Sequence, residues 1–271
     1  MLYPSDMARN LELTVHEALA EHAIFAELER IGEPWNHISV LGEVDSTNAH
    51  LERNLSRVVP GNPFMVTADE QTLGVGRLNR QWVSPFGAGI ALTIGISQSD
   101  IAHELSAIPL ISGLAVVNAL NGLNIPASLK WPNDVVFLDS QGLRKVGGLL
   151  VRRLNNAVAL GIGINVGLTE AELPVAHATS LAIEGFEISR EILIAHIIQH
   201  THNLLTQPVD WHSDYSLACS SLGRIVRIIQ TDKVCFSGTA LRVEPDGGLV
   251  LQTNSGEKIV TVGDVEHATL N

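Results

Sequence analysis

The segment 127–166 most constrains the fold of this 271-residue chain. It holds four short runs rich in apolar and β-branched residues, which predict strands at 127–131, 135–138, 146–152 and 157–166. Between three and seven residues separate neighbouring runs. A crossover that makes two strands parallel needs a dozen residues or more, so these strands are expected to pair as antiparallel meanders.

Before residue 221, the rest of the chain alternates strand-like runs with segments of helical periodicity. The expected strands are 38–44, 64–67 and 90–96, and the expected helices are 11–31, 104–123, 189–205 and 211–219. Asp45 or Ser46 could cap a further short helix, and Ser189 could cap the helix that follows it. Together these elements predict an α+β domain with a mixed, mostly antiparallel sheet and flanking helices.

A second, smaller unit follows Gly223, where the sequence changes to short strand-like runs. These runs are 225–230, 234–237, 239–243, 249–253 and 258–261. The turn signal Asp246-Gly247-Gly248 and a length of about fifty residues are typical of a small SH3-like β-barrel. We therefore expect an N-terminal helical extension over 1–35, a main domain over 36–221 and a barrel over 222–271.

The charge of the chain argues against nucleic acid and membranes as partners. Lys and Arg number 17 and Asp and Glu number 29, which gives a net charge of −12. Such a charge repels nucleic acid and anionic membranes at long range. The start of the chain has no basic segment followed by an apolar run, and we expect no stretch apolar enough to span a bilayer. The expected compartment is the cytoplasm.

The cysteines and a group of histidines do not indicate a metal site. Cys219 and Cys235 form no C-x-x-C pair, and in a reducing compartment we expect two small buried residues without a disulfide. His196, His200 and His202 lie on one expected helix, but the glutamate of a zinc-binding H-E-x-x-H motif is missing. A solvated or hydrogen-bonded helix face explains these histidines better than a metal site does.

Glycines and arginines gather in one loop, within residues 67–87. Gly74 and Gly76 let the backbone approach a ligand closely, and Arg77 and Arg80 supply permanently charged donors for an anion. The loop lacks the third glycine of a dinucleotide fingerprint, and no P-loop motif occurs in the chain. We therefore expect an anion-binding loop of another type.

Four motifs in this order resemble the catalytic module of biotin protein ligases. They are Asp45-Ser46-Thr47-Asn48, the glycine loop, Lys130-Trp131-Pro132-Asn133-Asp134 and Gly161-Ile162-Gly163-Ile164-Asn165. The resemblance covers roughly residues 36–271, including the barrel. It implies the class II synthetase-like biotin/lipoate ligase fold, without the N-terminal DNA-binding domain that some of these ligases have.

The resemblance implies an ATP-dependent, AMP-forming ligase. Biotin and ATP with Mg²⁺ would give biotinyl-5′-AMP, and biotin would then pass to a lysine of the biotin carboxyl carrier protein of acetyl-CoA carboxylase or of a related carboxylase. ATP and Mg²⁺ are the implied cofactors, with no permanently bound metal and with Mg²⁺ near Asp134. Because a carboxylate must attack a phosphate, cations are needed to stabilise the developing charge.

The resemblance also assigns roles to residues. The catalytic candidates are Lys145, Arg77 and Lys130. The biotin-binding candidates are Ser46, Thr47, Asn48, Gln71, Gly74, Val75, Gly76, Arg77, Lys145 and Gly148. The ATP-binding candidates are Arg77, Arg80, Trp82, Lys130, Asn133, Asp134 and Asn165. Hydroxyls and amides suit the planar ureido ring of biotin, and Trp131 or Leu149 could cover its apolar part.

The loop departs from the family pattern, which usually reads Gly-Arg-Gly-Arg-x-Gly-Arg. Val75 stands at the first arginine, and Leu78 and Asn79 occupy the next variable and glycine positions. The second and last arginines are kept as Arg77 and Arg80. One side-chain contact to biotin or its adenylate is therefore missing, so we expect weaker loop closure or a contact through the backbone of Val75.

Other interpretations stay open. A lipoate or octanoate ligase resembles this module in fold, although the motif at 130–134 and the barrel favour biotin. A biotin-responsive repressor would need a basic N-terminal domain of several helices, whereas the segment before residue 36 offers one acidic helix. A biotin-binding module without activity is a third alternative. An exposed edge strand of the central sheet could pair across a two-fold axis in a homodimer, or the N-terminal helix could equally cover that edge.

Overall fold

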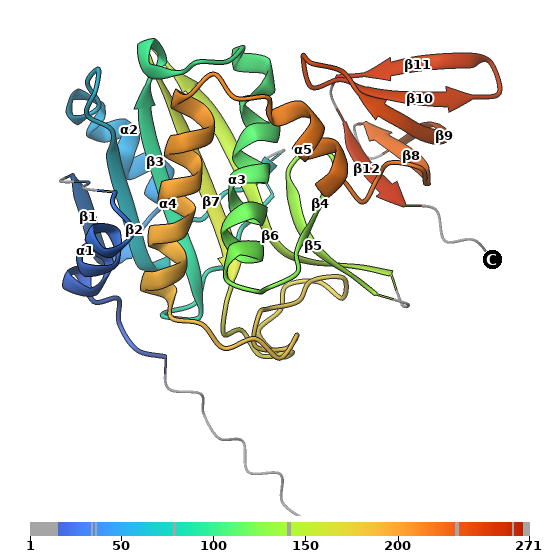
Figure 1. Cartoon of the computed structure of the whole chain (residues 1–271). Helices are drawn as coiled ribbons and strands as arrows, with labels where there is room; N and C mark the ends of the chain where they lie inside the picture. The colour runs from blue at the N-terminus through green and yellow to red at the C-terminus, as the bar shows by residue number, and fades with distance from the viewer. Residues whose placement is uncertain are drawn as a thin grey trace, which may run out of the picture.

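Seven strands form the central sheet of the structure, a computed structural model that describes residues 16–33, 35, 37–77, 80–139, 142–230, 233–261 and 263–267. The strands are β1 (Ile38–Val44), β2 (Phe64–Gln71), β3 (Gly89–Ser97), β4 (Ser128–Lys130), β5 (Asp134–Asp139), β6 (Gly142–Leu154) and β7 (Ala157–Asn165). Their order is β1-β2-β3-β7-β6-β5-β4 (Figure 1). β1 and β2 pair in parallel, and the other neighbours pair antiparallel. The expected meander is confirmed as β4 to β7.

Helices cover both faces of this sheet, which explains why β3 is buried along its whole length. The helices are α1 (Glu21–Arg30), α2 (Thr47–Arg53), α3 (Ile108–Gly122), α4 (Arg190–Thr206) and α5 (Trp211–Ala218). Alternate residues of β2 face opposite sides: Phe64 and Val66 join a cluster around Leu51 of α2, whereas Met65 joins the larger cluster that contains α3 and α4. The expected α+β fold with flanking helices is confirmed.

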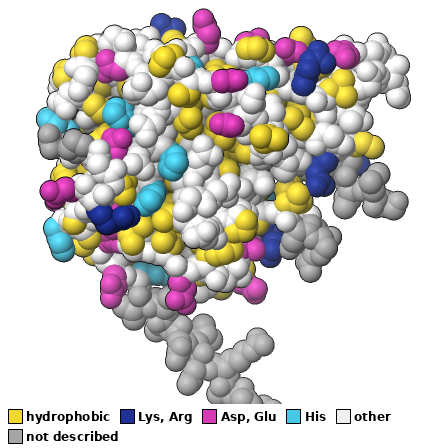
Figure 2. Space-filling model, in the orientation of Figure 1, with side chains coloured by type: hydrophobic (Ala, Val, Ile, Leu, Met, Phe, Trp, Pro, Cys, Tyr) yellow, Lys and Arg dark blue, Asp and Glu magenta, His cyan; other side chains and the backbone are white. Residues whose placement is uncertain are grey.

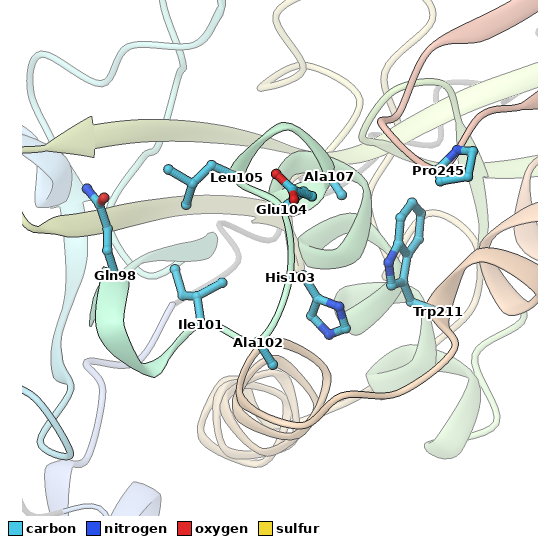
Figure 3. A pocket seen from close by; sticks show the side chains of 9 residues that line it. All are labelled: Gln98, Ile101, Ala102, His103, Glu104, Leu105, Ala107, Trp211 and Pro245. Carbon is cyan, nitrogen blue, oxygen red and sulfur yellow. The ribbon is translucent and has the colours of Figure 1, made fainter.

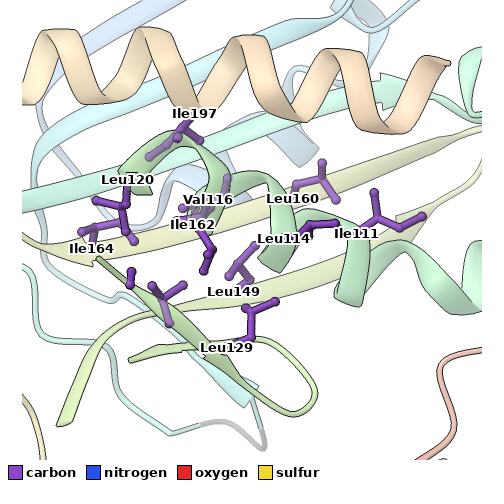
Figure 4. Close-up of a cluster of buried hydrophobic side chains, with 14 of the residues drawn as sticks. Ile111, Leu114, Val116, Leu120, Leu129, Leu149, Leu160, Ile162, Ile164 and Ile197 are labelled. Atoms are coloured by element: carbon purple, nitrogen blue, oxygen red, sulfur yellow. The ribbon is translucent and has the colours of Figure 1, made fainter. Parts of the chain in front are cut away.

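α3 is the central core helix. Its Leu114 and Leu120 lie in one buried cluster with Leu149 of β6 and Ile162 of β7 (Figure 4). The stretch Leu105–Gly122 is long and apolar enough to cross a membrane, with a mean hydropathy of 1.5, but 67% of it is buried inside the fold. Ser112 and Asn118 interrupt the stretch, so it is not the uninterrupted apolar run that a bilayer span was expected to need, and in this fold it is core.

The ends of several elements differ from the expectation. The helix expected over 11–31 begins at Glu21: residues 16–20 are not helical, and residues 1–15 lie outside the described part of the chain. Ser46 occupies the N-cap position of α2 without a side-chain capping bond, and Asp45 Oδ1 accepts from its backbone N–H at 2.8 Å. Ser189 caps α4 as expected, since its side chain accepts from Ile192 N.

The C-terminal unit is a five-stranded antiparallel sheet with the order β11-β10-β9-β8-β12. Its strands are β8 (Ile225–Gln230), β9 (Lys233–Val243), β10 (Leu249–Thr253), β11 (Gly256–Val260) and β12 (Asp264–His267). β9 joins two of the expected runs into one strand, and β12 was not expected. The expected small all-β unit is confirmed. Within the described residues no pairing joins β11 to β12, so its five strands form a sheet whose two edge strands are not paired with each other.

The C-terminal sheet docks onto the central domain through Trp131 (Figure 1). Trp131 Nε1 donates to Gly247 O at 3.0 Å, and the Trp131 backbone N–H donates to Ser221 Oγ at 3.1 Å. A further contact of 2.6 Å joins His212 Nε2 of α5 to Val243 O of β9. These contacts hold the two sheets together around the Lys130–Asp134 segment.

Cysteine and histidine side chains have structural roles. Cys219 is buried and unpaired, as expected, whereas the side chain of Cys235 lies outside the described part of the structure. His196 Nε2 lies 3.2 Å from Glu27 Oε1, and His202 Nδ1 lies 3.0 Å from Glu33 Oε2. The expected hydrogen-bonded helix face is confirmed for these two histidines, which join α4 to α1 and the turn after it.

Charged side chains are dispersed over one face of the molecule (Figure 2). On the face drawn in Figure 2, Lys and Arg side chains lie apart from one another, among acidic and apolar side chains. This distribution is consistent with the net charge of −12.

Candidate active site

Two lysine side chains from the strands that flank β5 converge on the carboxylate of Asp134, and the charge of Arg77 also acts on it. Lys145 Nζ of β6 lies 2.6 Å from Asp134 Oδ1, and Lys130 Nζ of β4 lies 3.7 Å from Oδ2. Burial alone would raise the pKa of Asp134, but the charges of Lys145, Lys130 and Arg77 outweigh it and hold the pKa below its usual value. Lys145 and Lys130 therefore meet at one carboxylate, and the charge of Arg77 lowers the pKa of the same group.

The path of β6 explains how Lys145 reaches this carboxylate. The register of β5 and β6 shifts between Lys145 and Gly147, so that Val146 is an extra residue in β6. Such a β-bulge re-aims the side chains beside it. Gly148 leaves the room that Lys145 occupies, because a Cβ there would lie 3.1 Å from Lys145 Nζ.

Hydroxyl and amide groups gather where β1 leads into α2. Gln71 Oε1 accepts from Thr47 N at 2.9 Å and from Thr47 Oγ1 at 3.0 Å, and Thr93 Oγ1 donates to Thr47 Oγ1 at 2.9 Å. The Asn48 amide lies against Gly161, where any Cβ would overlap it. Asn48 is 8% exposed, and its Oδ1 has no hydrogen-bond partner among the described residues. A buried acceptor of this kind fits a ligand that brings an N–H group.

Backbone hydrogen bonds hold the stem of the glycine loop. Gln71 N donates to Ser84 O at 3.3 Å, Trp82 N to Gly74 O at 2.9 Å and Gly76 N to Arg80 O at 2.8 Å. Gly74 permits this path, because a Cβ there would lie 2.5 Å from Trp82 O. The loop therefore folds back on itself, and Gly74 is needed for the close approach of its two sides.

The two arginines of the loop have different environments. Arg77 Nη2 donates to Gly263 O of the C-terminal sheet at 3.1 Å, whereas Arg80 is exposed. Val75, at the usual arginine position, is 44% exposed. Leu78 and Asn79 lie outside the described residues. The loop thus contacts the C-terminal sheet through Arg77, which the sequence pattern did not indicate.

Trp82 and Asn48 lie on the same face of β7. A Cβ at Gly163 would lie 2.7 Å from Trp82 Nε1, and the Asn48 amide lies against Gly161 two residues earlier. Residues two apart in a strand point to one face. Glycine at both positions therefore makes room for side chains of the glycine loop and of α2 directly on the sheet.

Comparison with known proteins identifies the family that shares these features. The model of the Biotin/lipoate A/B protein ligase family matches residues 41–168, and the model of the Biotin protein ligase C terminal domain matches residues 221–268. This chain belongs to the biotin protein ligase family. The first matched range contains every candidate residue from Ser46 to Asn165.

Relatives and solved structures of biotin protein ligases agree with this placement. The "Biotin--[acetyl-CoA-carboxylase] ligase" of Mycobacterium tuberculosis is 28% identical, over 92% of this chain and 96% of that protein. The "Bifunctional ligase/repressor BirA" of Bacillus subtilis is 30% identical, over 74% of this chain but 65% of its own length. The solved structure of the Aquifex aeolicus biotin protein ligase in complex with biotin and ATP is 28% identical, with a TM-score of 0.72. The match covers 86% of this chain and 99% of that chain.

The two asparagines that the biotin protein ligase pattern places near ATP differ in their environment. Asn133 is 3% exposed beside Asp134: its Nδ2 donates to Leu149 O at 3.2 Å, and its Oδ1 has no partner within the described residues. Asn165 is 6% exposed, and its Nδ2 donates to Thr179 O at 2.8 Å. Asn133 therefore offers a buried acceptor to a ligand, whereas Asn165 holds the loop after β7.

Trp131 and His177 make contacts that the sequence did not indicate. The indole N–H of Trp131 donates to Gly247 O, 116 residues away, and cover of biotin by its ring stays a prediction. His177 O accepts from Lys145 N at 2.8 Å, and Thr179 N donates to Lys145 O at 2.8 Å, so the loop after β7 fixes the backbone of the catalytic candidate. Neither contact has a local sequence signal.

Two open cavities lie outside this site. One of about 610 Å³ lies at the start of α3, with Trp211 and Pro245 on one side (Figure 3). The other, of about 450 Å³, is lined by Arg144 and by residues of the segment 170–183. No predicted site residue lines either cavity, so the candidate site is defined by its convergent polar groups.

Proposed function

We propose that this chain is an ATP-dependent biotin–protein ligase that forms biotinyl-5′-AMP and transfers biotin to a lysine of the biotin carboxyl carrier protein of acetyl-CoA carboxylase or of a related carboxylase. The observation that carries the proposal is the convergence of Lys145 and Lys130 on Asp134, whose pKa the charge of Arg77 also lowers. Two buried acceptors without partners among the described residues, Asn48 Oδ1 and Asn133 Oδ1, support it.

In the first step, a biotin carboxylate oxygen attacks the α-phosphorus of ATP, and the bond from that phosphorus to the bridging oxygen breaks. Pyrophosphate leaves with the bonding electrons. Lys145, Lys130 and Arg77 lower the repulsion between the two anions and stabilise the charge on the phosphoryl oxygens. Asp134 holds both lysines in place before the substrates arrive, since its two oxygens contact one ammonium each.

In the second step, the ε-amine of the acceptor lysine attacks the acyl carbon of biotinyl-5′-AMP. The amide bond forms, the bond to the phosphate oxygen breaks, AMP leaves and the amine loses a proton. The enzyme contributes positioning and charge without a covalent nucleophile. The glycine loop, whose Arg77 reaches the C-terminal sheet, shields the mixed anhydride from water until the carrier domain binds.

The polar groups at α2 favour biotin over lipoate. This cluster of hydroxyl and amide groups consists of Thr47, Gln71 and Asn48. Asn48 Oδ1 is a buried acceptor without a hydrogen-bond donor among the described residues. The ureido ring of biotin supplies N–H donors, whereas the dithiolane ring of lipoate supplies none. A site built to hydrogen-bond a substrate N–H discriminates strongly against an analogue that lacks it, because the buried group stays unpaired.

The metal requirement follows from the charges of the substrates. Asp134 is already paired with two lysines, so we propose that Mg²⁺ arrives with the phosphates of ATP and lies near Asp134 when the nucleotide binds. The carrier domain is the proposed protein partner, and the cytoplasm is the proposed compartment. With a net charge of −12, the chain is not expected to bind DNA or membranes.

Transfer of labelled biotin tests the function. Purified protein is incubated with radiolabelled biotin, Mg²⁺-ATP and a biotin carboxyl carrier domain, with radiolabelled lipoate and a lipoyl carrier domain in parallel. We expect label on the biotin carrier lysine only when ATP is present, and none above background from lipoate. Equal labelling from lipoate would assign a lipoate ligase, and ATP-independent biotin binding without transfer would assign a binding module.

A further inference from the structure

Residues 16–20, here called the N-terminal strap, cross the edge of the domain before α1 begins. The strap is held by side chains of the central domain. Leu19 N donates to Asp69 Oδ1 at 2.9 Å, Ala20 N donates to Glu191 Oε1 at 3.0 Å, and Glu17 O accepts from Arg190 Nη2 at 2.5 Å. Three of its backbone polar groups are therefore bonded to side chains of β2 and of the start of α4.

The strap lies directly on two glycines. A Cβ at Gly87 would lie 2.5 Å from His16 Cβ, and a Cβ at Gly167 would lie 3.2 Å from His16 Cε1. The side chain of His16 is 14% exposed. Gly87 ends the glycine loop, and Gly167 begins the loop after β7. The backbones of these loops are themselves joined, since Gly167 N donates to Ala88 O at 2.7 Å.

A buried ion pair connects the strap to the stem of the glycine loop. Asp69, 3% exposed, pairs with Arg190, 8% exposed, at 2.9 Å. The carboxylate of Asp69 binds the strap, while its backbone carbonyl accepts from Gly87 N at 2.9 Å. Arg190 Nη1 also donates to Gly89 O at 3.3 Å. The pair therefore fixes the strap and the end of the loop at the same place.

Both loops that meet the strap lead to the candidate site. The glycine loop begins at Gln71, two residues after Asp69, and Gln71 holds Thr47. The loop after β7 runs from Gly167 to His177, whose carbonyl holds the backbone of Lys145. A displacement of the strap would release the junction of these loops and loosen groups at both ends of the site.

We propose that the N-terminal strap is a positioning element that fixes the ends of the two loops and thereby preorganises the biotin site. The inference rests on the proposed function, because the loops matter only if they bind the substrate. Asp69, Arg190 and His16 act through the loops and touch no substrate. Preorganisation lowers the ordering cost of binding, so its loss weakens binding more than it slows a step that the same cations still promote.

Two variants loosen the strap in different ways. His16→Ala removes the imidazole ring that lies against Gly167 but keeps the Cβ that lies against Gly87, and Gly167→Val adds bulk beneath the strap at a glycine without positive φ. His22→Ala is the matched control, since His22 is an exposed histidine on α1. The measurements are hydrogen exchange of peptides within 72–88, the Kd for biotin by calorimetry, and KM and kcat for carrier biotinylation.

In the strap variants, the amide hydrogens of Trp82 and Gly87 should exchange about tenfold faster than in wild type. These variants should bind biotin roughly five- to tenfold more weakly, while kcat changes less than about twofold. The His22→Ala control should match wild type. Unchanged exchange and Kd in His16→Ala would overturn the inference even if Gly167→Val fails to fold. If wild type neither binds nor transfers biotin, the proposed function fails, while the exchange data still report whether the strap holds the loop.

Discussion

At the scale of residues, the site depends on a carboxylate that is neutralised before any substrate is bound. Asp134 contacts Lys145 and Lys130 and is influenced by Arg77. The sequence was enough to select these residues as candidates, because the type of each residue and the order of the motifs along the chain are visible in it. The bulge at Val146 that re-aims Lys145 could not be predicted, since it depends on the register between two strands.

The lowered pKa of Asp134 predicts a specific dependence of stability on pH. Its folded pKa lies below the ordinary value of 3.8, so the ionised form stabilises the fold above about pH 4, and this contribution disappears as the pH falls through the folded pKa. Asp134→Asn should therefore show a shallower loss of unfolding free energy below pH 4 than wild type. Denaturant titrations at several pH values measure this, with the exposed Asp214→Asn as control. Parallel curves for wild type and Asp134→Asn would contradict the pairing.

At the scale of elements, the glycine loop connects the two sheets through Arg77 and Gly263. Sequence predicted the loop, its glycines and its retained arginines. It could not predict the contact with Gly263, which is 186 residues away and depends on how the C-terminal sheet docks. The strand meander was predictable for the opposite reason, because its links are too short for crossover helices.

Arg77→Gly tests the loop. The variant loses a cation near Asp134 and the bond to Gly263 O, so the loop should close less firmly over the adenylate. We expect slower adenylate formation together with release of free biotinyl-5′-AMP, detected by chromatography and by biotinylation of bystander proteins. Losing one charge-assisted donor should lower the first step on the order of 10²-fold. Wild-type transfer with no free adenylate would show that Arg77 has neither role.

At the scale of the whole molecule, the Lys130–Asp134 segment serves two purposes. Lys130 and Asp134 belong to the site, whereas Trp131 between them binds the C-terminal sheet. The docking contact of Trp131 could not be predicted from the sequence, because its partner Gly247 lies 116 residues away. Docking of the C-terminal sheet and geometry of the site are therefore coupled through five consecutive residues.

Trp131→Phe tests this coupling. The variant keeps an aromatic side chain but removes the N–H that donates to Gly247 O, leaving that carbonyl without its partner. An unsatisfied buried group costs roughly 1–3 kcal/mol, so the free energy of unfolding should fall by that amount in denaturant titrations. Adenylate formation should slow as well, because Lys130 and Asp134 flank the change. A loss below about 0.5 kcal/mol, typical of a surface site, would argue against a docking role.

The most direct test of the cationic site is biotin-dependent exchange of labelled pyrophosphate into ATP without any carrier protein. Wild type should catalyse exchange with biotin and Mg²⁺, and not with lipoate. Lys145→Ala should lose at least on the order of 10²-fold in rate, equivalent to about 3 kcal/mol, while the exposed Lys258→Ala keeps the wild-type rate. Exchange that is unchanged in Lys145→Ala, or absent from wild type, would contradict the assignment of these residues to biotin activation.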